Sequence, residues 1–212
     1  MKKIIISTLM FFAVATSVFS QSLDYRILCS LQQHRTPQMD NAMRWVSNSL
    51  VLAPAVAVGL TAGGWVCDDA PTLEWGKTTS ISLLSTTGVT MGLKYAVHRP
   101  RPYQKYTDDL VSVTTEFDPS FPSGHTTMAF STAVSLSLCY PKWYVVAPSL
   151  LWASTVGFSR LYLGVHYPSD VLTGMIIGSA AAVITYMARE KQREELGIPQ
   201  PKGITIPIVI SF

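Results

Sequence analysis

The sequence predicts an all-helical bundle with about five transmembrane helices. Two observations support this prediction. Charged residues make up only 14% of the 212 residues, whereas a soluble globular domain contains about 25%. Five apolar stretches without a charged side chain are each long enough, at about 1.5 Å per helical residue, to cross most or all of a bilayer core of about 30 Å. They are Leu50–Val66, the interval between Lys77 and Lys94, Thr126–Tyr140, Trp143–Ser159 and Val171–Ala188.

Buried helices of a very apolar soluble domain would have the same lengths, so this alternative stays open at the level of sequence. Other classes are excluded. The net charge is +3, and no run of Lys and Arg is long enough to follow a phosphate backbone, so no nucleic-acid partner is expected. Cys29, Cys67 and Cys139 lack the spacing of a disulfide framework or a zinc site, and we expect them to be packing residues.

Residues 1–20 have the layout of a bacterial secretory signal. Met1-Lys2-Lys3 is positively charged, residues 4–19 are apolar apart from Ser and Thr, and Val18-Phe19-Ser20 supplies small residues where a signal peptidase cleaves. An uncleaved N-terminal membrane anchor is the alternative. In both cases residues 21–212 are expected to form one domain in the bacterial inner membrane.

Further local patterns concern the elements around the spans. The apolar positions of residues 21–44 suit a helix on the membrane surface, with a break between two helices at residues 35–37. Inside the spans, Gly88-x-x-x-Gly92 and Gly174-x-x-x-Gly178 predict close approach between helices. The final residues 203–212 are expected to be extended.

The connecting segments are predicted to divide between the two membrane faces. Counting five spans from an exported N-terminus puts residues 21–44, the loop from His98 to Pro122 and the loop from Arg160 to Asp170 on the periplasmic side. The C-terminal tail would face the cytoplasm, in keeping with the positive-inside rule. Its basic residues are Arg189, Lys191, Arg193 and Lys202.

Three basic side chains from separate segments are predicted to meet at the outer face. Lys94 ends one span, Arg101 follows in the next loop and Arg160 ends a later span. Ionisable groups at the ends of membrane spans are costly and are therefore functional candidates. Because like charges repel, we expect an anion between them. A phosphate fits, since Arg binds its oxygens bidentately and Lys adds a point charge.

Two more clusters at this face suggest chemistry on that anion. Pro122-Ser123-Gly124-His125 stands where a helix should begin, and the free N–H groups of a first helical turn attract negative charge. His166 and Asp170, four apart at another helix start, would share a face, so the carboxylate fixes the imidazole tautomer and leaves one nitrogen as nucleophile or base. His125 could protonate a leaving oxygen. A plain helix start and hydrogen-bonded capping histidines are the structural alternatives.

Together these motifs resemble those of a known family. Lys94-x6-Arg101-Pro102, Pro122-Ser123-Gly124-His125 and Ser159-Arg160-x5-His166-x3-Asp170 match in order and spacing the signature motifs of the type 2 phosphatidic acid phosphatase (PAP2) and vanadium haloperoxidase superfamily. The motifs cover residues 94–170. The flanking spans are similar to the membrane branch of the family, which implies a PAP2-like helical bundle.

The resemblance implies a phosphatase that uses neither a metal nor a cofactor. His166 would attack phosphorus to form a phosphohistidine, Asp170 would orient His166, and His125 would protonate the leaving alkoxide. The substrate would be a phosphorylated lipid, with phosphatidic acid, phosphatidylglycerol phosphate, undecaprenyl diphosphate and lipid A as candidates. The phosphoryl oxygens would be bound by Lys94, Arg101, Ser123, Gly124 and Arg160.

Three alternative functions follow from the same residues. A soluble periplasmic acid phosphatase of this superfamily would be extracted without detergent. A vanadium haloperoxidase would be activated by vanadate, whereas a phosphatase would be inhibited. A non-enzymatic anion-binding membrane protein would keep its function after His166→Ala, but a binder has no need of a paired His and Asp. No pattern in the sequence specifies an oligomeric state.

Overall fold

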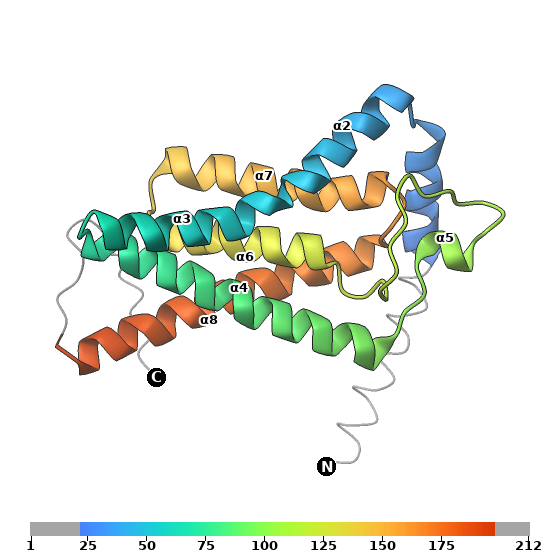
Figure 1. Ribbon diagram of the computed structural model, residues 1–212. Coiled ribbons are helices and arrows are strands. Elements are labelled where there is room, and N and C mark those ends of the chain that lie inside the picture. The colour runs from blue at the N-terminus through green and yellow to red at the C-terminus, as the bar shows by residue number, and fades with distance from the viewer. Residues whose placement is uncertain (1–21, 198–212) are drawn as a thin grey trace, which may run out of the picture.

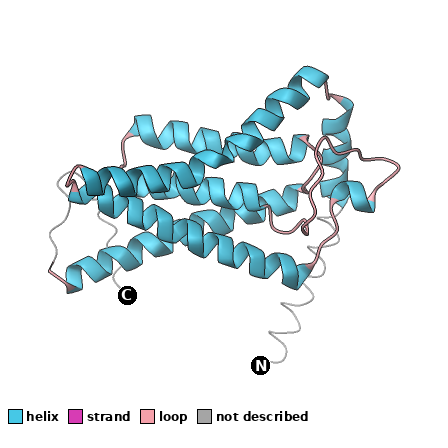
Figure 2. Cartoon of the chain, in the orientation of Figure 1, coloured by secondary structure: helices cyan, strands magenta, loops and turns pink. Residues whose placement is uncertain are grey.

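The computed structural model describes residues 22–197, and no strand occurs in that range (Figure 2). The predicted all-helical class is therefore confirmed. The predicted signal or anchor segment 1–20 and the predicted extended segment 203–212 lie outside the described residues. The longer helices are α2 (Pro37–Asn48), α3 (Leu52–Val66), α4 (Ala70–Val97), α6 (Gly124–Cys139), α7 (Trp143–Tyr162) and α8 (Pro168–Glu195).

Each of the five apolar stretches is helical over nearly its whole length, and α4 and α8 extend to 28 residues each. By length and composition, however, only two helical segments in residues 22–197 are apolar enough to cross a membrane, Pro37–Val66 and Pro168–Glu195. The other predicted spans contain many Ser and Thr residues, whose hydroxyl groups lower their hydrophobicity. The predicted number of five membrane spans therefore stays a prediction.

The N-terminal part of the described chain differs from the prediction in one respect. Residues 22–33 are helical, and the predicted break occurs before α2, where the Thr36 hydroxyl accepts a hydrogen bond from Met39 N at 3.3 Å. However, α2 is not a separate surface helix. One 3-10 turn, η1 (Ser49–Val51), joins it to α3. The physical reason is that no Gly or Pro interrupts residues 38–53, so nothing ends the helix there.

The central helix of the bundle is α6, which packs against α4, α7 and α8 (Figure 1). The predicted close approach of α8 is confirmed, because a Cβ atom at Gly178 would collide with the backbone of Thr127 and Ser131 in α6. A Cβ atom at Gly174 would lie 2.9 Å from the carbonyl oxygen of Ser123. The starts of α6 and α8 are thus held at backbone contact distance.

The same prediction for Gly88 and Gly92 is wrong. A Cβ atom at either position would meet no atom within 4 Å in the described chain, because both glycines lie on the exposed face of α4. The face of α4 that packs on α6 carries hydroxyl groups instead. Ser82 Oγ lies 2.7 Å from Ser131 Oγ, and Thr86 donates to the same oxygen at 3.2 Å.

One end of the bundle collects the segments that the sequence predicted to share a face. The C-termini of α4 and α7 and the N-termini of α6 and α8 meet there, beside the helical residues 22–33 and the short helix α5 (Pro102–Lys105) (Figure 1). The loop 106–123 covers this end. The turn at residues 140–142 and the C-terminus of α8 lie at the opposite end.

Candidate active site

His166 and Asp170 form a buried pair at the start of α8. Pro168 is the first residue of this helix, and Asp170 in its first turn folds back to accept a hydrogen bond from Tyr167 N at 3.0 Å. His166 Nδ1 lies 3.5 Å from Asp170 Oδ2. Both residues are almost entirely buried, with exposed fractions of 1% and 0%. Bulk water therefore does not screen the interaction between them.

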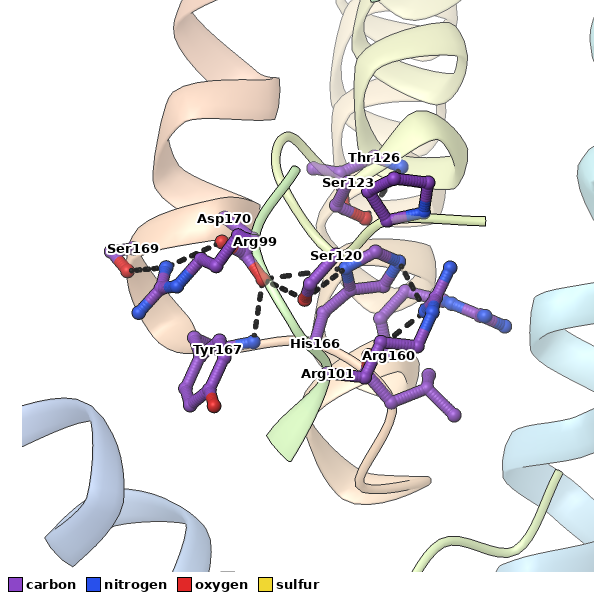
Figure 3. Close-up of polar contacts among 12 residues, drawn as sticks. Arg99, Arg101, Ser120, Ser123, Thr126, Arg160, His166, Tyr167, Ser169 and Asp170 are labelled. Atoms are coloured by element: carbon purple, nitrogen blue, oxygen red, sulfur yellow. Dashed lines mark hydrogen bonds and ion pairs between the residues drawn. The ribbon is translucent and has the colours of Figure 1, made fainter. Parts of the chain in front are cut away.

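The neighbours of His166 determine its tautomer. Arg101 Nη1 lies 3.3 Å from His166 Nε2, and a guanidinium can only donate. Nε2 must therefore carry the lone pair, and the proton is on Nδ1, facing Asp170. Figure 3 shows His166 between Asp170 and Ser120 on one side and Arg101 and Arg160 on the other. Burial lowers the pKa of His166 to about 4, Arg101 and Arg160 act in the same direction, and Asp170 opposes them. Above that pH the imidazole is neutral.

The three predicted cations converge, and two carboxylates of the loop 106–123 join them. Lys94 Nζ lies 2.9 Å from Asp118 Oδ2, and Arg101 Nη2 lies 2.6 Å from Asp118 Oδ1. Arg160 forms an ion pair with Glu116, whose Oε2 is 3.7 Å from Arg101 Nη2. The anion expected between the cations is therefore, in this structure, supplied by Glu116 and Asp118.

Both loop carboxylates are ionised. Burial alone would raise the pKa of Asp118, but Lys94 and Arg101 outweigh it and lower that pKa to about 2. Burial likewise opposes Arg160 and Arg101 at Glu116, and the net effect is a lowered pKa. The side chains of Asp118 and Glu116 are 41% and 25% exposed, against 1–5% for the three cations. The cations are buried, whereas the two carboxylates are partly accessible to solvent.

Neutral acceptors hold the cations in place. Arg101 donates to the carbonyl oxygens of Asp118 and Val165, each at 2.9 Å. Lys94 donates to the carbonyl oxygen of Pro119, and Arg160 donates to the hydroxyl group of Ser47 in α2. Since these contacts do not depend on Glu116 or Asp118 side chains, the cation positions would persist if another anion replaced the carboxylates.

The start of α6 faces the same site. Ser123 is its N-cap, and its hydroxyl accepts from Thr126 N at 3.5 Å while its own N–H donates to the Asp170 carbonyl at 3.2 Å. At Gly124, a Cβ atom would lie 3.9 Å from Lys94 Cε. The structure thus brings the predicted residues to one end of the bundle. They are Lys94, Arg101, Ser123, Gly124, His125, Arg160, His166 and Asp170.

His125, on the first turn of α6, interacts electrostatically with Glu116, Arg160 and His166. Burial and the nearby Arg160 lower the pKa of His125 to about 3, and Glu116 opposes them. The predicted role of His125 as proton donor stays a prediction.

Sequence reasoning missed five residues that contact the site. Glu116 and Asp118 stand in a loop between basic motifs, a signal of charge pairing that the sequence did contain. Ser120 Oγ donates to Asp170 Oδ2 at 2.5 Å, and Arg99 Nη1 donates to Asp170 Oδ1 at 2.6 Å. Asp24, in the helix of residues 22–33, forms an ion pair with Arg99 at an Nη2–Oδ2 distance of 2.9 Å. No local sequence pattern identifies Asp24 as a site residue.

With this geometry established, the chain can be assigned to a family. The sequence profile of the PAP2 superfamily matches residues 77–194, which span most of α4 through α8 and include every predicted site residue. The chain belongs to the PAP2 superfamily.

Two curated relatives show the same similarity over shorter segments. The undecaprenyl-diphosphatase of Sulfolobus acidocaldarius is 36% identical over 86 residues, which cover 41% of this chain and 41% of that protein. The lipid A 4'-phosphatase of Bacteroides thetaiotaomicron is 36% identical over 81 residues, which cover 38% of this chain and 36% of that protein. Each alignment spans less than half the length of the curated relative.

Solved structures match over a larger part of the chain. Aquifex aeolicus LpxE superimposes with a TM-score of 0.66 at 26% identity, covering 76% of this chain and 93% of that one. A transmembrane PAP2-type phosphatidylglycerolphosphate phosphatase from Bacillus subtilis superimposes with a TM-score of 0.69 at 25% identity, covering 88% and 96%. The fold is therefore that of the transmembrane PAP2 phosphatases.

Proposed function

We propose that this protein is a membrane lipid phosphatase that hydrolyses a phosphomonoester or diphosphate lipid through a phosphohistidine intermediate, with no metal ion. The observation that carries the proposal is the neutral His166 imidazole, whose unprotonated Nε2 faces Arg101, while Lys94, Arg101 and Arg160 converge beside it. The arrangement supplies a nucleophile and fixed positive charge at one place, as phosphoryl transfer requires.

Substrate binding begins with an exchange of anions. The phosphoryl oxygens take over the contacts of Lys94, Arg101 and Arg160 that Glu116 and Asp118 make in this structure. When Arg101 turns to a phosphoryl oxygen, its hydrogen bond to His166 Nε2 is released. Binding therefore frees the lone pair that attacks.

The reaction then has two steps. His166 Nε2 forms a bond to phosphorus as the bond to the leaving oxygen breaks. His125 donates to that oxygen the proton that it takes up when the negatively charged phosphate binds beside it. Asp170 stabilises the positive charge that the imidazole gains. In the second step His125 accepts a proton from water, the water oxygen attacks phosphorus, and the N–P bond breaks to release inorganic phosphate. Three cations supply the charge stabilisation that a metal ion would otherwise give.

A lipid is the substrate class that best fits the position of the site. The site lies at one end of a bundle whose flanks expose large apolar side chains, so a phosphate can enter at the interface while its acyl or prenyl chains stay in lipid. The relatives are named for undecaprenyl diphosphate, lipid A and phosphatidylglycerolphosphate. The predicted export signal supports a periplasmic site in a bacterial inner membrane. The exposed apolar residues include Val51, Val58, Leu84, Leu151, Ile176 and Ile184.

Phosphate release tests the proposal. The protein, purified in detergent with EDTA present, should release inorganic phosphate from at least one of lipid A, phosphatidylglycerol phosphate, phosphatidic acid and undecaprenyl diphosphate. His166→Ala should lower the rate by at least about 1,000-fold, because it removes the nucleophile. His34→Ala, at an exposed histidine of the same end of the bundle, is the matched control and should leave the rate unchanged.

Three outcomes would contradict the proposal in different ways. Complete loss of activity with EDTA would exclude the metal-free mechanism. Near-normal turnover by His166→Ala would exclude His166 as nucleophile. Extraction of active protein from membranes without detergent would favour the soluble phosphatase instead.

A further inference from the structure

We propose that Arg99, held in place by Asp24, is a positioning residue for the Asp170–His166 pair. The inference rests on the proposed function and extends it to two residues that the motif resemblance gave no role. Arg99 is one of the six residues between Lys94 and Arg101 to which the motif assigns no role, and Asp24 precedes the part of the chain that the family profile matches, residues 77–194.

The two oxygens of Asp170 have different partners. Oδ2 faces His166 and accepts hydrogen bonds from Ser120 Oγ at 2.5 Å and Tyr167 N at 3.0 Å. Oδ1 accepts from Arg99 Nη1 at 2.6 Å, and this is the one side-chain hydrogen bond to Oδ1 found among the described residues. Because a planar carboxylate is oriented by both oxygens, Arg99 sets its rotation and with it the direction of Oδ2 toward His166.

Arg99 is itself held from three directions. Its Nη2 pairs with Asp24 Oδ2 at 2.9 Å, its Nη1 donates to Ser169 Oγ at 2.8 Å, and its Cζ lies 3.8 Å from the centre of the Tyr167 ring. Asp24 is only 3% exposed and also accepts from Ser169 N at 3.0 Å. A guanidinium fixed at this many points loses little further entropy when it binds Asp170.

Arg99 approaches Asp170 from the side opposite His166, as Figure 3 shows, and does not share the ion pairs of Lys94, Arg101 and Arg160 with the loop carboxylates. Its positive charge offsets two buried carboxylates, which would be costly to keep ionised without a partner. During attack the imidazole becomes cationic, and an ionised, correctly aimed Asp170 lowers the energy of that state. Loss of Arg99 should therefore slow the chemical step more than it weakens substrate binding.

The test compares steady-state kinetics of Arg99→Met, Arg99→Lys and Asp24→Asn with the wild type in detergent, normalised to monodisperse folded protein. Arg99→Met should lower kcat roughly 10- to 100-fold with KM within about twofold. Arg99→Lys keeps the positive charge but loses the planar guanidinium that donates to two acceptors at once, so its kcat should lie between those of Arg99→Met and the wild type. Asp24→Asn should lower kcat less than Arg99→Met does. Arg44→Met, at an exposed arginine of the same end that donates to Val113 O, is the matched control.

A pH profile separates positioning from a merely structural role. Loss of the Arg99 contact should shift the acid limb of kcat, which reports protonation of His166, to lower pH in Arg99→Met, because a misaligned Asp170 stabilises the imidazolium less. The shift should be smaller in Arg99→Lys, which keeps a positive charge beside Asp170. A loosened fold would lower activity without moving this limb. The other titratable and charged groups around His166 and Asp170 are unchanged in both variants. They are Asp24, Lys94, Arg101, Glu116, Asp118, His125, Arg160 and Tyr167.

The outcomes distinguish this inference from the proposed function. If the wild type releases no phosphate, or His166→Ala is as active as the wild type, the proposed function fails. If the wild type is active, His166→Ala is inactive, and Arg99→Met, Arg99→Lys and Asp24→Asn all keep kcat within about twofold, the positioning role is overturned. A raised KM at unchanged kcat would also overturn it. If Arg99→Met does not fold, the kcat values of Arg99→Lys and Asp24→Asn relative to the wild type decide whether the positioning role holds.

Discussion

Glu116 and Asp118 are the residues that set the electrostatic balance of the site. Lys94, Arg101 and Arg160 are each at most 5% exposed, and three such cations would repel one another without anions between them. The two carboxylates stabilise the site between turnovers. In the proposed function they also compete with the phosphoryl group, because its oxygens take over the contacts that the carboxylates make with the cations.

This competition predicts a gain of affinity from a substitution in the site. Glu116→Gln keeps the size of the side chain but removes the charge that pairs with Arg160. The inhibition constant for vanadate and the KM for the lipid phosphate should both fall, by roughly 3- to 10-fold, equivalent to about 0.7–1.4 kcal/mol.

Asp108→Asn is the matched control, because it removes one negative charge from an exposed position of the same loop. It should leave both constants nearly unchanged. If Glu116→Gln instead raised KM, or if Asp108→Asn had the same effect as Glu116→Gln, direct competition between Glu116 and phosphate would be wrong.

The motif residues could be predicted from the sequence as members of one site, because their residue types and spacings are informative. His166 and Asp170 are four apart at a helix start. Lys94 and Arg160 stand in the last turns of predicted spans, and Arg101 follows in the next loop, so their convergence follows from local pattern and topology. Asp24 could not be predicted, since its role arises only when the helix of residues 22–33 packs beside α8 and brings its carboxylate to Arg99.

At the scale of elements, the contact between α6 and α8 positions the candidate catalytic groups. Gly174 and Gly178 bring α8 against the backbone of α6, and Ser123 N donates to the Asp170 carbonyl across this contact. The helix that carries Asp170 and the helix that carries His125 are therefore fixed to each other. Any side chain inserted between them would displace both.

A pair of glycine substitutions tests this packing. Gly178→Val places a Cβ atom against the backbone of Thr127 and Ser131, neither of which can move without shifting α6. It should lower the free energy of unfolding by at least about 2 kcal/mol and reduce phosphate release. Gly92→Val introduces the same side chain where no atom lies within 4 Å, and it should change stability by less than about 0.5 kcal/mol. Thermal unfolding in detergent measures both, and equal stability of the two variants would contradict the packing role.

The positions of the helices could be predicted from the charge-free stretches. Which face of each helix packs against a neighbour could not. The spacing of Gly88 and Gly92 is the same as that of Gly174 and Gly178, yet only the second pair faces a neighbouring helix. On α4 the contact to α6 is made by Ser82 and Thr86. Small-residue spacing identifies a surface that can pack closely, and the rest of the bundle determines whether it does.

At the scale of the whole molecule, every motif residue lies at one end of the bundle. The ends of α4, α6, α7 and α8 that contain the motif residues meet there. The loop 106–123 and the first described helix lie at the same end, although they are far apart in sequence (Figure 1). A substrate phosphate at the interface would meet fixed cations, while its hydrophobic chains would run along the exposed apolar flanks. The fold is thus compatible with the proposed lipid substrate without any headgroup-specific pattern.

The most direct measurement of the central claim is the location of the phosphoryl group during turnover. Rapid quenching of the wild type with its lipid phosphate, followed by mass spectrometry under alkaline conditions that preserve phosphohistidine, should find the phosphoryl group on the peptide that contains His166. The modification should be absent in His166→Ala. A phosphoryl group on a different residue, or steady turnover by His166→Ala, would contradict the account.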